Sequence, residues 1–158
     1  MTEPTTGADL LNAIIGAHPG SPLAALRAQR PDILRHTQGS HDVLLSPDDP
    51  GGLSLAERAL VARHVAELEG HAALTAHYRA LLDARGTPAA GARTTAIMAH
   101  AERVAVGPGS ATKAHLEALT VVGLQARDIV ALAQLVAFVA YQVRVAVGLS
   151  LLAQDMAA

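Results

Sequence analysis

The chain has 158 residues and a formal net charge of −2, with 51% hydrophobic and 16% charged residues. This length supports one domain with its own hydrophobic core. There is no lysine and arginine cluster, and the chain holds only two tyrosines and one phenylalanine, so we expect no nucleic-acid partner. No cysteine is present, which excludes disulfides, thiolate metal ligands and thiol nucleophiles.

The high hydrophobic content predicts that part of the apolar surface is covered by another subunit. A small monomer needs more polar surface than this composition supplies. We therefore expect a homo-oligomer that buries an apolar patch between its subunits. The first twenty residues have no basic segment before their short apolar run, so we expect no signal peptide and a cytoplasmic location.

The N-terminal region predicts short helices after a polar start. Residues 1–7 are polar, and we expect them to be disordered. Helices should follow within residues 8–45, where capping residues and prolines suited to a first helical turn mark the starts near Asp9, Ser21 and Pro31. Gly39 and Ser40 weaken the middle of the third helix. The Pro, Asp and Gly residues of 46–52 predict a loop.

The stretch after this loop predicts one long central helix, near residues 54–85. Ser54 and Glu57 have the S-x-x-E spacing of a capping box, which marks the start of a helix. Apolar residues then recur at helical spacing as far as residue 85, where Gly86 and Pro88 end the pattern.

Further helices are predicted at residues 94–106 and 112–122, followed by a long apolar helix near 126–154. No segment shows the alternation of a strand. The chain is therefore predicted to be all-α, with about six to seven helices in a single domain spanning 1–158 and a helical core at 53–154. The last helix is long enough to cross a bilayer. Polar groups such as Gln142 and Arg144 interrupt it, so we interpret it as buried in protein and expect no membrane partner.

Several segments resemble one family of small helical proteins. The opening LSLAER at residues 53–58 and the segment RDIVALAQLVAFVAYQVR at 127–144 are similar to stretches of the alkyl hydroperoxidase D-like (AhpD-like), or carboxymuconolactone decarboxylase-like, superfamily. Two further runs, at 20–31 and 49–54, are similar to a peroxidase-related branch of unknown role. The resemblance covers roughly residues 9–153 and implies an all-helical AhpD-like domain.

The redox motif of this family is missing. Thiol-active members carry N-G-C-x-x-C followed by a histidine, whereas this chain reads EGHAALTAHY from residue 69. If Gly70 matches the motif glycine, the resemblance places His71 and Leu74 at the thiol positions and Tyr78 at that of the assisting histidine. A shift by one residue places His77 there instead, with Gly70 and Ala73 at the thiol positions. Neither register supplies a thiolate, so thiol peroxidase activity of this chain alone is excluded.

Titratable residues on the predicted central helix form the candidate catalytic site. His64, Glu67 and His71 are spaced by three and four residues, so one helix would place them on the same side. His77 and Tyr78 follow further along. A histidine tuned by a carboxylate can transfer protons near neutral pH. The alternative interpretation is structural, with these groups hydrogen-bonded at a subunit interface.

Other polar residues are candidates for binding. Arg144, Tyr141 and Glu57 could form a subsite for a substrate carboxylate, or Arg144 could pair with Glu57 or Glu67 to fix the packing of helices. The spacing H-x-x-E-x-x-x-H also offers metal-ligand types. One helix rarely completes a metal site, so no metal and no cofactor is predicted.

The sequence is compatible with three functions. The preferred one is a peroxidase-related protein of antioxidant defence that lacks the redox pair and acts as an oligomeric or accessory partner, beside a cysteine-bearing relative. The second is a cysteine-independent acid–base enzyme acting on a small carboxylated or lactone-like substrate. The third is a small-molecule or metal-binding protein without turnover.

Overall fold

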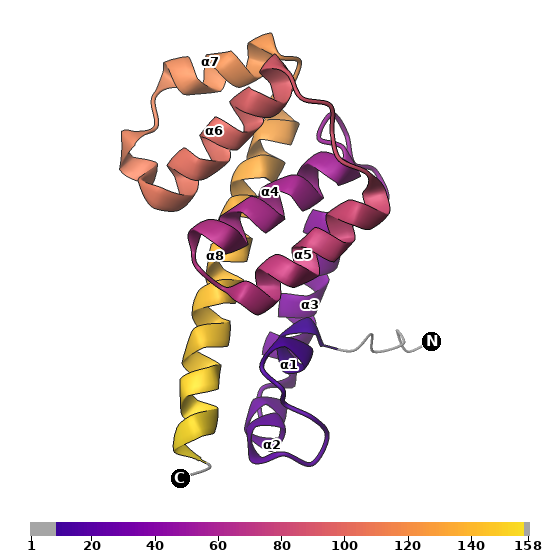
Figure 1. Ribbon diagram of the computed structural model, residues 1–158, viewed down its shortest axis with the longest axis vertical. Helices are drawn as coiled ribbons and strands as arrows, with labels where there is room; N and C mark the ends of the chain where they lie inside the picture. Colours follow the sequence, from indigo (N-terminus) through magenta and orange to yellow (C-terminus); the bar gives the residue numbers. More distant parts are fainter. Residues whose placement is uncertain (1–8, 157–158) are drawn as a thin grey trace.

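The computed structural model describes residues 9–156, which form eight α-helices, one short 3-10 turn and no strand (Figure 1). The all-α class is therefore confirmed, with more helices than the six or seven expected. The expected disorder of residues 1–7 lies outside the described residues. The elements are α1 (Leu10–Ile14), α2 (Pro22–Ala28), α3 (Pro31–Leu45), α4 (Leu55–Leu68), α5 (Ala72–Arg85), α6 (Ala92–Val106), η1 (Pro108–Ser110), α7 (Lys113–Val121) and α8 (Ala126–Asp155).

Helix α8 is the axis of the molecule. Helices α1 to α4, α6 and α7 all pack against it. Figure 1 shows α4 and α5 as an antiparallel pair across its middle, α6 and α7 near its N-terminal end, and α1 to α3 beside its C-terminal half. The predicted long C-terminal helix is confirmed, and it is 30 residues long. Its length and composition alone would let it cross a membrane, yet contact with six other helices is also expected of the central helix of a globular protein.

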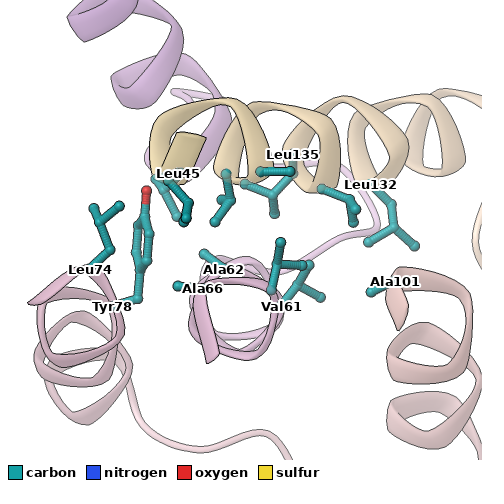
Figure 2. Packing of buried hydrophobic residues seen from close by; sticks show 14 of the residues in the cluster. Leu45, Val61, Ala62, Ala66, Leu74, Tyr78, Ala101, Leu132 and Leu135 are labelled. Carbon is teal, nitrogen blue, oxygen red and sulfur yellow. The ribbon is translucent and has the colours of Figure 1, made fainter. Parts of the chain in front are cut away.

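The hydrophobic core lies where α4 and α5 meet α8. Leu132 and Leu135 of α8 and Val61 of α4 are fully buried (Figure 2). Ala62 and Ala66 are buried on the same side of α4. Because alanine side chains are small, α4 can approach α8 closely through these positions. This contact fixes the position of the α4–α5 pair and of every candidate residue that it carries.

The predicted single helix near residues 54–85 is wrong in one respect, because it is divided into α4 and α5. Gly70 has φ +76°, the left-handed conformation that commonly ends a helix. His71 is extended, and its Nδ1 accepts a hydrogen bond from the Leu74 N–H at 3.3 Å, which caps the start of α5. The predicted capping box at Ser54 and Glu57 is present at the start of α4. As a consequence, His64 and Glu67 do not share a helix with His77 and Tyr78.

Helix α3 also differs from the sequence expectation. It continues from Pro31 to Leu45 through Gly39 and Ser40, where a weakened middle was expected. Nothing lies within 4 Å of a side-chain position at Gly39, so this glycine faces open space. Of the fifteen residues of α3 only Leu45 is buried, and the helix is therefore anchored in the core chiefly at its C-terminal end.

Candidate functional site

The turn between α4 and α5 is the place where the resemblance locates a redox pair. With Gly70 as the motif glycine, the first thiol position is His71, which caps α5, and the second is Leu74, which is fully buried in the core. Both positions thus have a local role in folding: one begins a helix and the other fills the core. The turn offers no nucleophile.

Arg144 lies beside this turn but not as expected. Its guanidinium is bonded to Glu69 at 3.1 Å and its side chain is 68% exposed. Neither Glu57 nor Glu67, the two carboxylates considered for Arg144, is its partner. The pair instead joins the middle of α8 to the end of α4 at the surface, where an ion pair contributes little to stability.

The proposed acid–base group is not gathered around one cavity in the described part of the chain. Glu67 is exposed and lies 3.7 Å from Arg63. His64 is half-buried, and its Nε2 is shielded from solvent without a hydrogen-bond partner. A shallow hollow of about 560 Å³ beside Glu67 is lined mostly by α5, without His64, His71 or Arg144. The arrangement therefore gives no support to acid–base catalysis by these residues.

A different set of polar side chains does come together, between α3, α5 and α8. This set, here called the tyrosine cluster, consists of His41, His77, Tyr78 and Gln142. Tyr78 is fully buried, points from α5 toward α8 (Figure 2), and its hydroxyl donates a hydrogen bond to Gln142 Oε1. The His77 ring lies 5.1 Å from the Tyr78 ring and 5.8 Å from the His41 ring, between centroids.

Burial controls the protonation of the tyrosine cluster. It raises the pKa of the Tyr78 phenol, which is therefore a neutral donor at physiological pH. Burial also lowers the pKa of His77, and the charge of nearby His41 lowers it further. Tyr78 and His77 were expected in the site, whereas His41 was missed. Gln142 was noticed only as a polar residue of the last helix, and its 64-residue separation from Tyr78 in sequence left no signal of their contact.

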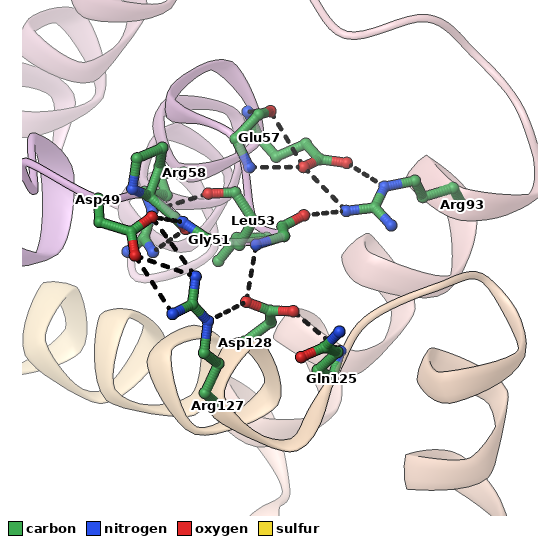
Figure 3. A network of polar contacts seen from close by, with 12 residues as sticks. Asp49, Gly51, Leu53, Glu57, Arg58, Arg93, Gln125, Arg127 and Asp128 are labelled. Atoms are coloured by element: carbon green, nitrogen blue, oxygen red, sulfur yellow. Dashed lines mark hydrogen bonds and ion pairs between the residues drawn. The ribbon is translucent and has the colours of Figure 1, made fainter.

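Glu57 belongs to a second polar network, at the N-terminal end of α8 (Figure 3). Its Oε2 accepts the Ser54 N–H at 2.9 Å, and its Oε1 accepts from Arg93 Nε at 2.6 Å. Burial alone raises the pKa of the Glu57 carboxyl, but the hydrogen bonds from Arg93 and Ser54 outweigh it and the pKa lies below its ordinary value. Both carboxylate oxygens therefore accept hydrogen bonds within the fold, one at the start of α4 and one from α6. We interpret Glu57 as a structural residue.

Tyr141, the remaining expected binding residue, lies on the exposed side of α8. Its hydroxyl is 3.4 Å from Thr37 Oγ1. The residue lines a small groove of about 180 Å³ between α3 and α8, together with apolar residues such as Ile33 and Val145. This groove is separate from the α4–α5 turn, so Tyr141 does not share a site with His64, Glu67 or His71. Within residues 9–156, no three His, Asp or Glu side chains lie close enough together to hold a metal ion.

Solved structures resemble this arrangement, although no protein-family model matches the sequence and no curated protein is significantly similar to it. One is an alkylhydroperoxidase AhpD core, an uncharacterized peroxidase-related protein from Ralstonia eutropha JMP134, with a TM-score of 0.56, 24% identity, and coverage of 86% of this chain and 78% of that one. Another is an uncharacterized peroxidase-related protein from Silicibacter sp. TM1040, with a TM-score of 0.58, 20% identity, and coverage of 94% and 92%. The chain has an AhpD-like fold, as the sequence resemblance predicted.

Proposed function

We propose that this chain is a peroxidase-related protein that has no thiol peroxidase activity of its own and serves as an oligomeric accessory partner in antioxidant defence. One observation carries the proposal. On the AhpD-like scaffold, the turn that would hold a redox pair holds the capping residue His71 and the core residue Leu74 instead. The partner would be a second copy of this chain or a cysteine-bearing relative.

The chemistry of the chain supports an accessory role. Peroxide reduction by this scaffold needs a thiolate as nucleophile, and the sequence contains no cysteine. The phenol of Tyr78 cannot take its place, because it is fully buried, neutral and already donates its proton to Gln142.

The exposed side of α8 supports self-association. Val130, Tyr141, Val147 and Leu151 recur there at helical spacing and are all exposed, Leu151 to 61%. The two arginines along this side are already paired within the chain: Arg127 with Asp49 at 3.2 Å and Arg144 with Glu69 at 3.1 Å. An apolar stripe whose charges have partners can be covered by another subunit without leaving a charge unpaired.

Purified protein is expected to reduce neither hydrogen peroxide nor an organic hydroperoxide in the presence of a dithiol reductant. The physical reason is the lack of a thiolate. Peroxide consumption should be measured over a range of protein concentrations, with a cysteine-bearing thiol peroxidase assayed in parallel as the positive control. Turnover that rises in proportion to the concentration of this protein would contradict the proposal.

Val147→Glu combined with Leu151→Glu is expected to weaken self-association by at least about 30-fold, because two carboxylates would have to be desolvated in the interface. The measurement is molar mass by light scattering during size-exclusion chromatography across a dilution series. The matched control is Val121→Glu, which changes a valine that is 86% exposed and lies on α7, near the other end of α8 from Val147 and Leu151. It should leave the molar mass unchanged. A monomeric wild type at high micromolar concentration would contradict self-association while leaving the peroxidase result intact.

A further inference from the structure

The contact between His41 and His77 joins the N-terminal helices to the α4–α5 pair. The two imidazole rings lie 5.8 Å apart and are tilted by 51°, and the His41 ring stacks at 6.3 Å from the Tyr78 ring. The Nε2 atoms of both histidines are shielded from solvent and have no hydrogen-bond partner in the described part of the chain. Each of the two neighbouring imidazoles therefore has one ring nitrogen cut off from water, and burial favours the neutral form of His77.

Helix α3 is held unevenly along its length. Its C-terminal end is fixed by Arg58, which donates to Leu44 O at 2.8 Å, and by Arg85, which donates to Leu45 O at 2.8 Å. Toward its N-terminus, His41 packs on α5 and Thr37 lies 3.4 Å from the Tyr141 hydroxyl of α8. Upstream of residue 41, Gln38 Oε1 accepts the Leu10 N–H at 3.0 Å and α3 packs on α2 and α8. No residue of this part of α3 is fully buried, so it has less burial to resist opening than the C-terminal end.

Only one of the two histidines has a carboxylate beside it in the described part of the chain. On α3, Asp42 Oδ1 lies 3.0 Å from His41 Nδ1, whereas no carboxylate hydrogen-bonds to His77 among the described residues. The tyrosine cluster contributes only uncharged groups from α5 and α8, Tyr78 and Gln142. Among the described residues, His41 is the one charged group that shifts the pKa of His77.

We propose that His41 and His77 form a pH-sensitive latch, which holds α3 against α5 at neutral pH and loosens as the pH falls through the ordinary titration range of histidine. Opening of α3 would bring the His77 Nε2 atom into water, where it can bind a proton. Protonation of both histidines in place would instead set two positive charges side by side in a shielded position.

The direction of the pH effect follows from proton linkage. Burial, and then the charge of His41, lower the pKa of His77 in the closed structure, so the opened state binds more protons than the closed one. The stabilisation of the closed state is complete above the ordinary histidine pKa of about 6.5 and is lost as the pH falls from there toward the lowered value. Each extra proton can raise the opening equilibrium by at most about tenfold per pH unit.

Hydrogen–deuterium exchange of the full chain at about pH 7.5 and pH 5.5, corrected for the intrinsic exchange rate, tests the latch. For peptides covering residues 34–42, the opening equilibrium of α3 derived from the exchange rates is expected to be at least about threefold larger at the lower pH. The exchange protection of α4 and of the middle of α8 should stay the same. His77→Gln, which keeps a polar side chain but cannot titrate, should make the α3 profile independent of pH.

The control is His36→Gln, which removes a histidine from the exposed side of the same helix and should leave the wild-type pH dependence unchanged. If His77→Gln reduces the helical signal in circular dichroism, His41→Gln tests the contact from α3. It removes the nearby charge but not the burial that lowers the pKa of His77, so the pH dependence should weaken without disappearing. Equal α3 protection at the two pH values in the wild type, or unchanged pH dependence in both glutamine variants, would overturn the proposal. Neither result depends on whether the chain self-associates, provided that all samples are compared at one protein concentration.

Discussion

Arg58→Met is expected to lower the free energy of unfolding by about 3–5 kcal/mol. The Arg58 side chain is nearly buried and donates to three backbone carbonyls: Leu44 O at 2.8 Å, Leu53 O at 3.0 Å and Pro50 O at 3.0 Å. These carbonyls lie at the end of α3 and in the loop that leads to α4. Methionine would fill most of the space but leave the carbonyls without a donor, and an unsatisfied buried acceptor costs about 1–3 kcal/mol.

Urea unfolding followed by circular dichroism, at one fixed protein concentration, measures this change. The control is Arg35→Met, because Arg35 is 68% exposed and its ion-pair partner Asp32 is 78% exposed. A change within about 0.5 kcal/mol is expected there. A loss below about 1 kcal/mol for Arg58→Met would mean that water replaces the guanidinium at these carbonyls, and the anchoring role of Arg58 would then be wrong.

Tyr78→Ala is expected to be of comparable severity, with a loss of about 3–5 kcal/mol. The ring is fully buried between α3, α5 and α8, so its removal leaves a cavity in the core and an unpaired Gln142 Oε1. The same unfolding experiment measures the change. Tyr141→Ala is the control, since that ring is 42% exposed and its removal should cost much less. Equal losses in the free energy of unfolding for the two variants would show that the buried Tyr78 ring stabilises the core no more than the exposed Tyr141 ring does.

The hydroxyl of Tyr78 can be separated from its ring by a double-mutant cycle. Tyr78→Phe leaves Gln142 Oε1 buried without a donor and should cost about 1–3 kcal/mol. Gln142→Leu in the same background removes the acceptor as well, so the double variant should lose less than the sum of the two single changes. Additive losses would indicate that the two side chains do not interact in solution.

The buried polar residues discussed above connect helices to one another. Glu57 and Tyr78 each join helices that are distant in sequence, and Arg58 joins α4 to the end of the preceding helix, α3. Tyr78 stands where one register of the resemblance has the assisting histidine of the redox site. At that position this chain has a buried polar side chain, and its hydrogen bond connects α5 to α8.

The sequence by itself determined the features that depend on neighbouring residues. The spacing of Ser54 and Glu57 predicted the start of α4, because a capping box closes hydrogen bonds within four residues. Ser21 and Pro22 likewise marked the start of α2, and the apolar run after residue 126 predicted α8. The LSLAER and RDIVALAQL segments were sufficient to predict the AhpD-like fold, and the lack of cysteine by itself excludes thiol chemistry.

Only the tertiary structure decided where that helical pattern breaks and which polar groups meet. The apolar spacing continues across Gly70 because α4 and α5 both face the same core, so periodicity alone could not show the turn between them. The contacts of Tyr78 with Gln142 and of His41 with His77 join residues 64 and 36 positions apart. Such contacts follow from how α3, α5 and α8 pack, and no local pattern encodes them, which is why the contacts within the tyrosine cluster were not predicted from the sequence.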